Sequence, residues 1–171
     1  RRQRQMCIRD RSTGDSELDR VLGKGVVPGA VVLLGGEPGI GKSTLMLQSV
    51  LAMAKKAERI LYVAGEESPE QVRMRAERLG EVSPALYVFP ETDTQAVLRE
   101  LEANRPSVVI IDSIQTMFLP EVESAPGSVS QIRETAGAFT RFAKQHHVPV
   151  FFIGHITKEG SLAGPKVLEH M

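Results

Sequence analysis

The 171 residues suit one domain with a buried core, and 21 basic against 21 acidic residues give a net charge of zero, which favours no class of charged partner. The single cysteine, Cys7, excludes an intrachain disulfide and a cysteine-based zinc site, and it favours a reducing compartment. Since no apolar run reaches the roughly 18 residues of a membrane helix and no secretory signal is visible, we expect a cytoplasmic protein without a membrane anchor.

The first eleven residues differ from the rest of the chain. They are basic but show neither apolar periodicity nor turn chemistry, so residues 1–11 are interpreted as a disordered or artefactual leader. A basic arm that contacts phosphates is the alternative. From Ser12 onward the pattern is globular, and residues 12–171 are expected to form one domain.

Short apolar runs alternate with helical segments over most of this domain. The runs that predict strands are Ala30–Leu34, Ile60–Ala64, Leu86–Phe89, Val108–Ile111 and Val150–Ile153. The expected helices are Lys42–Lys55 and three more that begin at capping-box spacings, from Ser68 to about Leu79, from Thr92 to about Asn104 and from Ser128 to about His146. Residues Gln115–Gly127, rich in proline and glycine, predict a loop. This alternation predicts an α/β fold, a three-layer sandwich with a mainly parallel central sheet whose strand order stays open.

A phosphate-binding loop lies between the first expected strand and the first expected helix. The segment Gly36-Glu37-Pro38-Gly39-Ile40-Gly41-Lys42-Ser43 fits G-x-x-x-x-G-K-S/T at every fixed position. Its N–H groups are expected to cradle phosphates, with Lys42 at the β- and γ-phosphates, Ser43 on Mg²⁺ and Thr44 on a phosphate oxygen. A glycine-rich turn with a solvated lysine is the alternative. ATP is favoured over GTP because the chain lacks an Asn/Thr-Lys-x-Asp guanine motif.

Further polar side chains follow expected strands, at the edge where a parallel sheet presents its ligand-binding residues. Asp112 is expected to hold Mg²⁺ through its water shell, with capping of the next turn as the alternative. Glu66 is the expected general base, whereas Glu66 and Glu67 could instead stabilise a helix N-terminus. His155 is expected to hydrogen-bond the γ-phosphate or the attacking water, or is an ordinary polar residue. Catalysis is thus assigned to Glu66, Lys42 and His155, and the metal to Ser43 and Asp112.

Five blocks in order resemble the RecA-like ATPase core of the bacterial RadA family: STGDSELDRVL, GEPGIGKST, YVAGEES, VVIIDSIQT and FFIGHITKEGSLAGPKVLEHM. The resemblance covers about Ser12 to Met171, and the broader kin are RecA recombinases, KaiC and DnaB-type helicases. It implies a RecA-like P-loop NTPase that forms a hexameric ring, hydrolyses ATP and moves on single-stranded DNA. The family role is branch migration in recombinational repair, with RecA-coated recombination intermediates as partners.

The resemblance assigns roles to individual residues. It implies that Lys42 and Ser43 belong to the phosphate loop, Glu66 is the catalytic glutamate, Asp112 is the Walker B residue and His155 replaces the γ-phosphate-sensing glutamine. The implied DNA-binding loops are about Gln115–Ser130 and Thr157–Pro165, with Arg133, Lys158 and Lys166 as candidate contacts or solvated surface charges. A subunit-interface arginine or lysine is expected to complete the site.

Several features of the RadA family have no counterpart here. These are the four-cysteine zinc finger, the KNRFG motif and the C-terminal Lon-protease-like domain, so the chain resembles a fragment without zinc that is truncated at both ends. The alternative function is a KaiC-like signalling ATPase without a DNA role. A small-molecule kinase would need a lid and an acceptor pocket, for which the sequence offers no signature.

Overall fold

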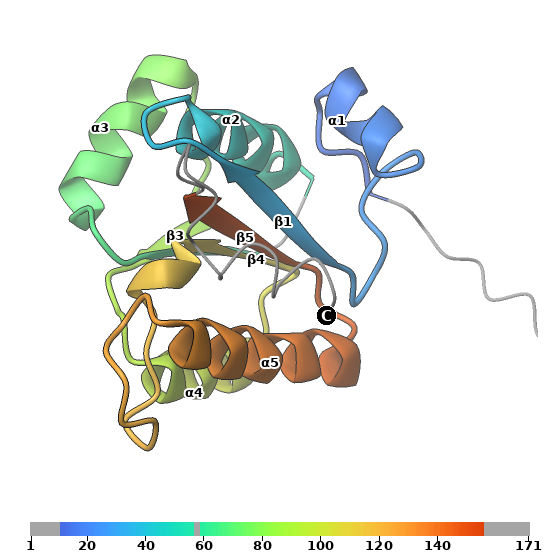
Figure 1. Ribbon diagram of the computed structural model, residues 1–171. Coiled ribbons are helices and arrows are strands. Elements are labelled where there is room, and N and C mark those ends of the chain that lie inside the picture. Colours follow the sequence, from blue (N-terminus) through green and yellow to red (C-terminus); the bar gives the residue numbers. More distant parts are fainter. Residues whose placement is uncertain (1–10, 57–58, 156–171) are drawn as a thin grey trace, which may run out of the picture.

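The computed structural model describes residues 11–56 and 59–155 (Figure 1). In this part of the chain, five strands form one parallel sheet in the order β1-β5-β4-β2-β3. The strands are β1 (Val31–Gly36), β2 (Ile60–Ala64), β3 (Leu86–Phe89), β4 (Val108–Asp112) and β5 (Val150–His155). The helices are α1 (Ser16–Val21), α2 (Lys42–Ala54), α3 (Pro69–Leu79), α4 (Thr94–Asn104) and α5 (Val129–His146), with a 3-10 turn, η1 (Ile114–Thr116).

The three central strands are apolar along most of their length because both faces of the sheet are covered. Along β2, Ile60, Tyr62 and Ala64 join a core with α2 and α3, whereas Leu61 and Val63 join a second core with α4 and α5. The same alternation runs through β4 and β5. Figure 1 shows α2 and α3 above the sheet and α4 and α5 below it. The predicted three-layer α/β sandwich of RecA-like type is confirmed.

Polar caps set the starts of α3 and α4, and one predicted cap is wrong. Ser68 forms the complete capping box that its spacing predicts, with a proline in the first turn of α3. Helix α4 begins one residue later than predicted, with Asp93 as its cap, accepting from the Gln95 N–H. The Thr92 carbonyl accepts from the Phe118 N–H at 3.0 Å, so it does not accept the first intrahelical bond, which the Asp93 carbonyl accepts from the Val97 N–H at 3.0 Å.

The loop between β4 and α5 contains η1 and is tied down by one buried glutamine. Ser128 caps α5 as predicted, but the Gln131 side chain does not complete a capping box. Its Nε2 instead donates to the carbonyls of Leu119, Val122 and Ser124 at 2.9–3.2 Å, and its Oε1 accepts from the Leu119 N–H at 2.9 Å. The loop is therefore held by hydrogen bonds to a side chain of the helix that follows it.

Three strands extend further than their apolar runs predict. Strands β1, β4 and β5 end at Gly36, Asp112 and His155, one to two residues beyond the predicted ends. The extension of β1 and β5 is mutual, because Gly36 is paired with His155 in the register of the two strands. As a result, Gly36, Asp112 and His155, which the sequence pattern places in loops, are the last strand residues at the carboxyl edge of the sheet.

The segment before β1 contains a short helix that the apolar pattern does not predict. Helix α1 buries none of its residues and begins where the Asp15 carboxylate accepts from two backbone N–H groups. Ahead of it, Arg11 pairs antiparallel with Val26.

The division of the chain into residues 1–11 and 12–171 stays a prediction, because residues 1–10 and 156–171 lie outside the described ranges. Within those ranges, no helix combines the length and the apolar character needed to cross a membrane.

Candidate nucleotide-binding site

The phosphate loop connects the end of β1 to the start of α2. Gly39 and Gly41 adopt φ values of +76° and +94°, a region that favours glycine and allows the chain to turn sharply into the helix. Gly41 is the N-cap of α2 and no side chain caps its first turn. The N-terminal N–H groups of α2 and the positive end of its dipole are therefore directed at the loop, as in an anion-binding helix start.

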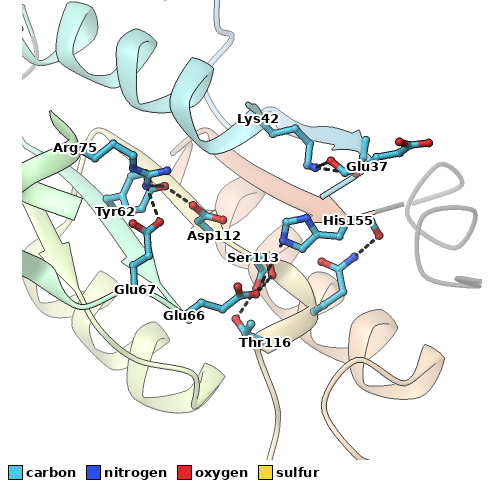
Figure 2. Close-up of polar contacts among 12 residues, drawn as sticks. Glu37, Lys42, Tyr62, Glu66, Glu67, Arg75, Asp112, Ser113, Thr116 and His155 are labelled. Atoms are coloured by element: carbon cyan, nitrogen blue, oxygen red, sulfur yellow. Dashed lines mark hydrogen bonds and ion pairs between the residues drawn. The ribbon is translucent and has the colours of Figure 1, made fainter. Parts of the chain in front are cut away.

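The Lys42 side chain folds back over this loop and is only 7% exposed. Its Nζ donates to the carbonyl oxygens of Gly36 at 2.7 Å and Glu37 at 2.6 Å (Figure 2). Burial lowers the pKa of Lys42 below its ordinary value, and the charge of Asp112 offsets only part of this effect. The loop carbonyls thus hold an ammonium group in the position where a phosphate would compete for it.

Asp112 reaches the same edge from the end of β4, and the sheet register determines its neighbour. Ala64 of β2 pairs with Asp112, and Tyr62 pairs with Ile110, so Tyr62 and Asp112 are diagonal neighbours on the face that α2 and α3 cover. The Tyr62 hydroxyl donates a hydrogen bond to Asp112 Oδ2. Burial, followed by the nearby Asp112 charge, raises the pKa of the Tyr62 phenol far above its ordinary value, which keeps it protonated as a donor.

Glu66 lies just beyond β2, close to residues at the carboxyl ends of two other strands. Its Oε1 accepts a long hydrogen bond from Ser113 Oγ at 3.4 Å and lies 4.0 Å from His155 Nε2 (Figure 2). The Glu66 side chain remains 62% exposed. His155 Nδ1 is buried and has no hydrogen-bond partner among the described residues. Glu66 and His155 are therefore adjacent, with the glutamate open to solvent.

The backbone before Glu66 passes very close to η1. A Cβ added to Gly65 would lie 1.9 Å from Thr116 Oγ1, and the Gly65 N–H donates to the Asp112 carbonyl at 2.8 Å. Glycine is thus required here by close approach rather than by φ. The peptide bond between Asp112 and Ser113 is cis.

Glu67 points away from Glu66 and forms an ion pair with Arg75 of α3, at 2.8 Å. Arg75 also donates to the Tyr62 hydroxyl, at 3.4 Å. Sequence reasoning missed Tyr62, Arg75 and Ser113. The one available signal was Tyr62, a hydroxyl-bearing side chain in an otherwise aliphatic strand, since a buried phenol needs a partner.

The donor set at this edge fits a nucleotide polyphosphate with Mg²⁺. It combines open helix N–H groups, the Lys42 ammonium, the Ser43 hydroxyl and the Asp112 carboxylate. Among the described residues, no group of three or more His, Cys, Asp or Glu side chains is arranged to hold a metal ion. That arrangement is compatible with Mg²⁺, which keeps water and substrate oxygens and needs one or two protein ligands.

The residues predicted to contact DNA are only partly described. Thr157–Pro165, Lys158 and Lys166 lie outside the described residues. Arg133 is exposed in the first part of α5. The loop Gln115–Ser130 contains no lysine or arginine and two glutamates, so its sequence offers no cluster of positive charge.

Comparisons with known proteins agree with this geometry. A family model described as an AAA domain matches residues 4–161. The chain therefore belongs to the AAA domain family and is an ATPase domain. It is 52% identical to the protein named DNA repair protein RadA from Synechocystis sp. and 52% identical to that from Halalkalibacterium halodurans. It is 51% identical to the protein of that name from Streptococcus pyogenes.

Each of these three alignments covers 93% of this chain and 35% of the relative, so the chain spans about a third of the length of the curated relatives it matches. The resemblance to a RadA ATPase core is thereby confirmed. The roles of individual residues rest on the geometry described above.

Proposed function

We propose that the chain is the ATP-hydrolysing core of a DNA repair protein of the RadA type, acting in the cytoplasm. Its turnover is stimulated by single-stranded DNA and drives branch migration in recombinational repair. The observation that carries the proposal is the convergence of Lys42, Asp112 and Glu66 from α2, β4 and the end of β2 at one edge of the sheet. The names of the relatives support the DNA repair context.

Nucleotide binding would use the phosphate loop from Gly36 to Thr44. The Lys42 ammonium would exchange the two loop carbonyls for phosphate oxygens, a stronger, charge-assisted interaction. Ser43 and Asp112 would hold Mg²⁺, Asp112 through water. When bound, the ion neutralises negative charge on the phosphates. ATP is the proposed nucleotide because the guanine motif is absent from the sequence.

Hydrolysis would proceed by in-line attack of water on the γ-phosphate. The exposed carboxylate of Glu66 is the candidate to orient this water and accept its proton. His155, whose Nε2 lies 4.0 Å from Glu66 Oε1, is the candidate to hydrogen-bond the water or the γ-phosphate. Lys42 and the loop N–H groups would stabilise the charge that develops on the phosphate.

Coupling to DNA would use the loop Gln115–Ser130. This loop begins shortly after Asp112 and is attached to β5 through Gln115, whose Nε2 donates to the His155 carbonyl at 3.0 Å. A hexameric ring, with an arginine or lysine from a neighbouring subunit completing each site, is part of the proposal, as is action on RecA-coated intermediates.

The test is ATP hydrolysis by this chain with and without single-stranded DNA, compared with Lys42→Ala. We expect single-stranded DNA to stimulate hydrolysis by the wild type. In Lys42→Ala, the rate of hydrolysis with DNA should fall by roughly 100-fold or more, because the charged partner of the phosphates is removed. Lys55→Ala, at the exposed far end of the same helix, is the matched control and should behave as wild type. Nucleotide binding without any response to DNA would contradict the DNA role and favour the KaiC-like alternative.

A further inference from the structure

Tyr62 is a polar residue in the interior of the sheet. It is 0% exposed, in the middle of β2, where every other residue is aliphatic. Phenylalanine would fill nearly the same space without a hydroxyl to satisfy, so packing alone does not account for a tyrosine here. The hydroxyl meets this cost by donating to Asp112 Oδ2, on the face of the sheet toward α2 and α3.

The direction of this hydrogen bond is defined by a third residue. An arginine guanidinium only donates hydrogen bonds, so the contact between Arg75 and the Tyr62 oxygen, at 3.4 Å, occupies an acceptor site of the phenol. The phenol hydrogen is then directed to Asp112. Figure 2 shows the three side chains in a row, with Arg75 and Tyr62 on one side of Asp112.

The hydrogen bonds from Arg75 to Tyr62 and from Tyr62 to Asp112 fix Oδ2 of the Asp112 carboxylate and do not involve its Oδ1. In the described part of the chain, the one hydrogen bond to the Asp112 carboxylate reaches Oδ2. A carboxylate held by one oxygen has a defined plane, and its Oδ1 can be offered to an ion or its water shell. Arg75 also pairs with Glu67, directly after Glu66, so the same arginine connects the β2–α3 connection to the Asp112 carboxylate.

We propose that Tyr62 is a positioning residue for Mg²⁺: its hydroxyl, oriented by Arg75, holds Asp112 in the orientation that binds the ion through water. The inference rests on the proposed function, since it requires that Asp112 serve the metal. Neither Tyr62 nor Arg75 is among the residues proposed to contact the nucleotide. Their effect is therefore on the metal dependence of binding and not on nucleotide affinity itself.

The experiment is a Mg²⁺ titration of the binding of a fluorescent ATP analogue to wild type and Tyr62→Phe. We expect the half-saturating Mg²⁺ concentration to rise about tenfold in Tyr62→Phe, because loss of a partner of a metal ligand weakens metal binding. Affinity in EDTA should be unchanged. Tyr87→Phe is the matched control: Tyr87, the only other tyrosine, is 47% exposed on β3, and its variant should titrate as wild type.

A second variant, Arg75→Gln, keeps the proposal testable if Tyr62→Phe does not fold. It should raise the half-saturating Mg²⁺ concentration in the same direction by a smaller factor. If both single variants fold, the double variant should match Tyr62→Phe alone, because Arg75 acts through the phenol. A Mg²⁺ titration equal to wild type in the folded variants, even with reduced stability, would overturn the inference and leave the proposed function standing. If wild type itself shows no Mg²⁺-dependent binding, the proposed function fails and the inference with it.

Discussion

Asp19 and Asp112 lie in two regions of the molecule, and their carboxylates differ in how many hydrogen-bond donors they have and in how far along the chain those donors lie. Asp19, in α1, accepts from the Ser12 hydroxyl at 2.6 Å and from the Thr13 N–H and hydroxyl at 2.7 and 2.8 Å. Burial raises the pKa of Asp19, but the bonds from Ser12 and Thr13 outweigh it and lower the pKa below the ordinary value. Both oxygens of this carboxylate are therefore used by donors six or seven residues away.

Asp112 accepts from a donor 50 residues away, and only at Oδ2 within the described residues. Both aspartates lie in blocks that resemble the RadA family, yet their partners differ. A carboxylate surrounded by local donors stabilises a turn, whereas one held on a single oxygen at the carboxyl edge of a parallel sheet retains capacity for a ligand. The number and distance of the donors separate a structural aspartate from a candidate metal-binding one.

Glu66→Gln should give the largest effect on turnover. We expect kcat for ATP hydrolysis to fall about 100-fold to 10,000-fold, because a general base is lost, while ATP binding remains. Steady-state hydrolysis and equilibrium binding measure the two quantities. Glu67→Gln is the control, since Glu67 is paired with Arg75, and it should retain most of the activity. Equal losses in the two variants would contradict the assignment of Glu66.

Gly65→Ala should damage both the fold and the site. The new Cβ would overlap with Thr116, so η1 or the end of β2 must move, at a cost of about 1–3 kcal/mol in the free energy of unfolding. Hydrolysis should fall as well, because Glu66 and Asp112 flank this contact. Chemical denaturation gives the stability. Gly80→Ala is the control, since a Cβ there would meet no described atom within 4 Å, and a matching loss there would exclude the steric explanation.

Asp19→Asn should affect stability alone. Weakening the bonds from Ser12 and Thr13 should lower the free energy of unfolding by about 1–3 kcal/mol at pH 7. Because the pKa of Asp19 is lower in the folded state, its contribution is present above the unfolded value of 3.8 and is lost as the pH falls through the folded value. Chemical denaturation at pH 7 and below pH 3.8 measures the free energy of unfolding of wild type and variant. The difference between the two should be smaller below pH 3.8 than at pH 7. Reduced ATP binding by a folded variant would argue against a purely structural role.

The strands, the phosphate loop and the meeting of Asp112, Glu66 and His155 at one edge could be predicted from the sequence. Buried parallel strands are continuous apolar runs, and their carboxyl ends share an edge. The pairing of Tyr62 with Asp112 could not, because it depends on the register of β2 against β4, which no local pattern encodes. Strand order was open for the same reason.

Helix α1 and the hydrogen bonds of Gln131 to the preceding loop were not predicted from the sequence, for two other reasons. Helix α1 has six residues, none buried, so it carries no apolar period and depends on the Asp15 cap. Gln131 stood at a capping-box position, and only the path of the preceding loop shows that its side chain bonds the loop backbone instead. Both features depend on polar contacts rather than on hydrophobic pattern.

Whether Asp112 holds the metal is tested by the Mg²⁺ dependence of ATP-analogue binding in Asp112→Asn and Asp19→Asn, measured under conditions where both variants are folded. We expect Asp112→Asn to raise the half-saturating Mg²⁺ concentration by about 10-fold to 100-fold, and Asp19→Asn to leave it at the wild-type value. Wild-type Mg²⁺ dependence in Asp112→Asn, or an equal shift in both variants, would contradict the assignment of the metal to the carboxyl edge of the sheet.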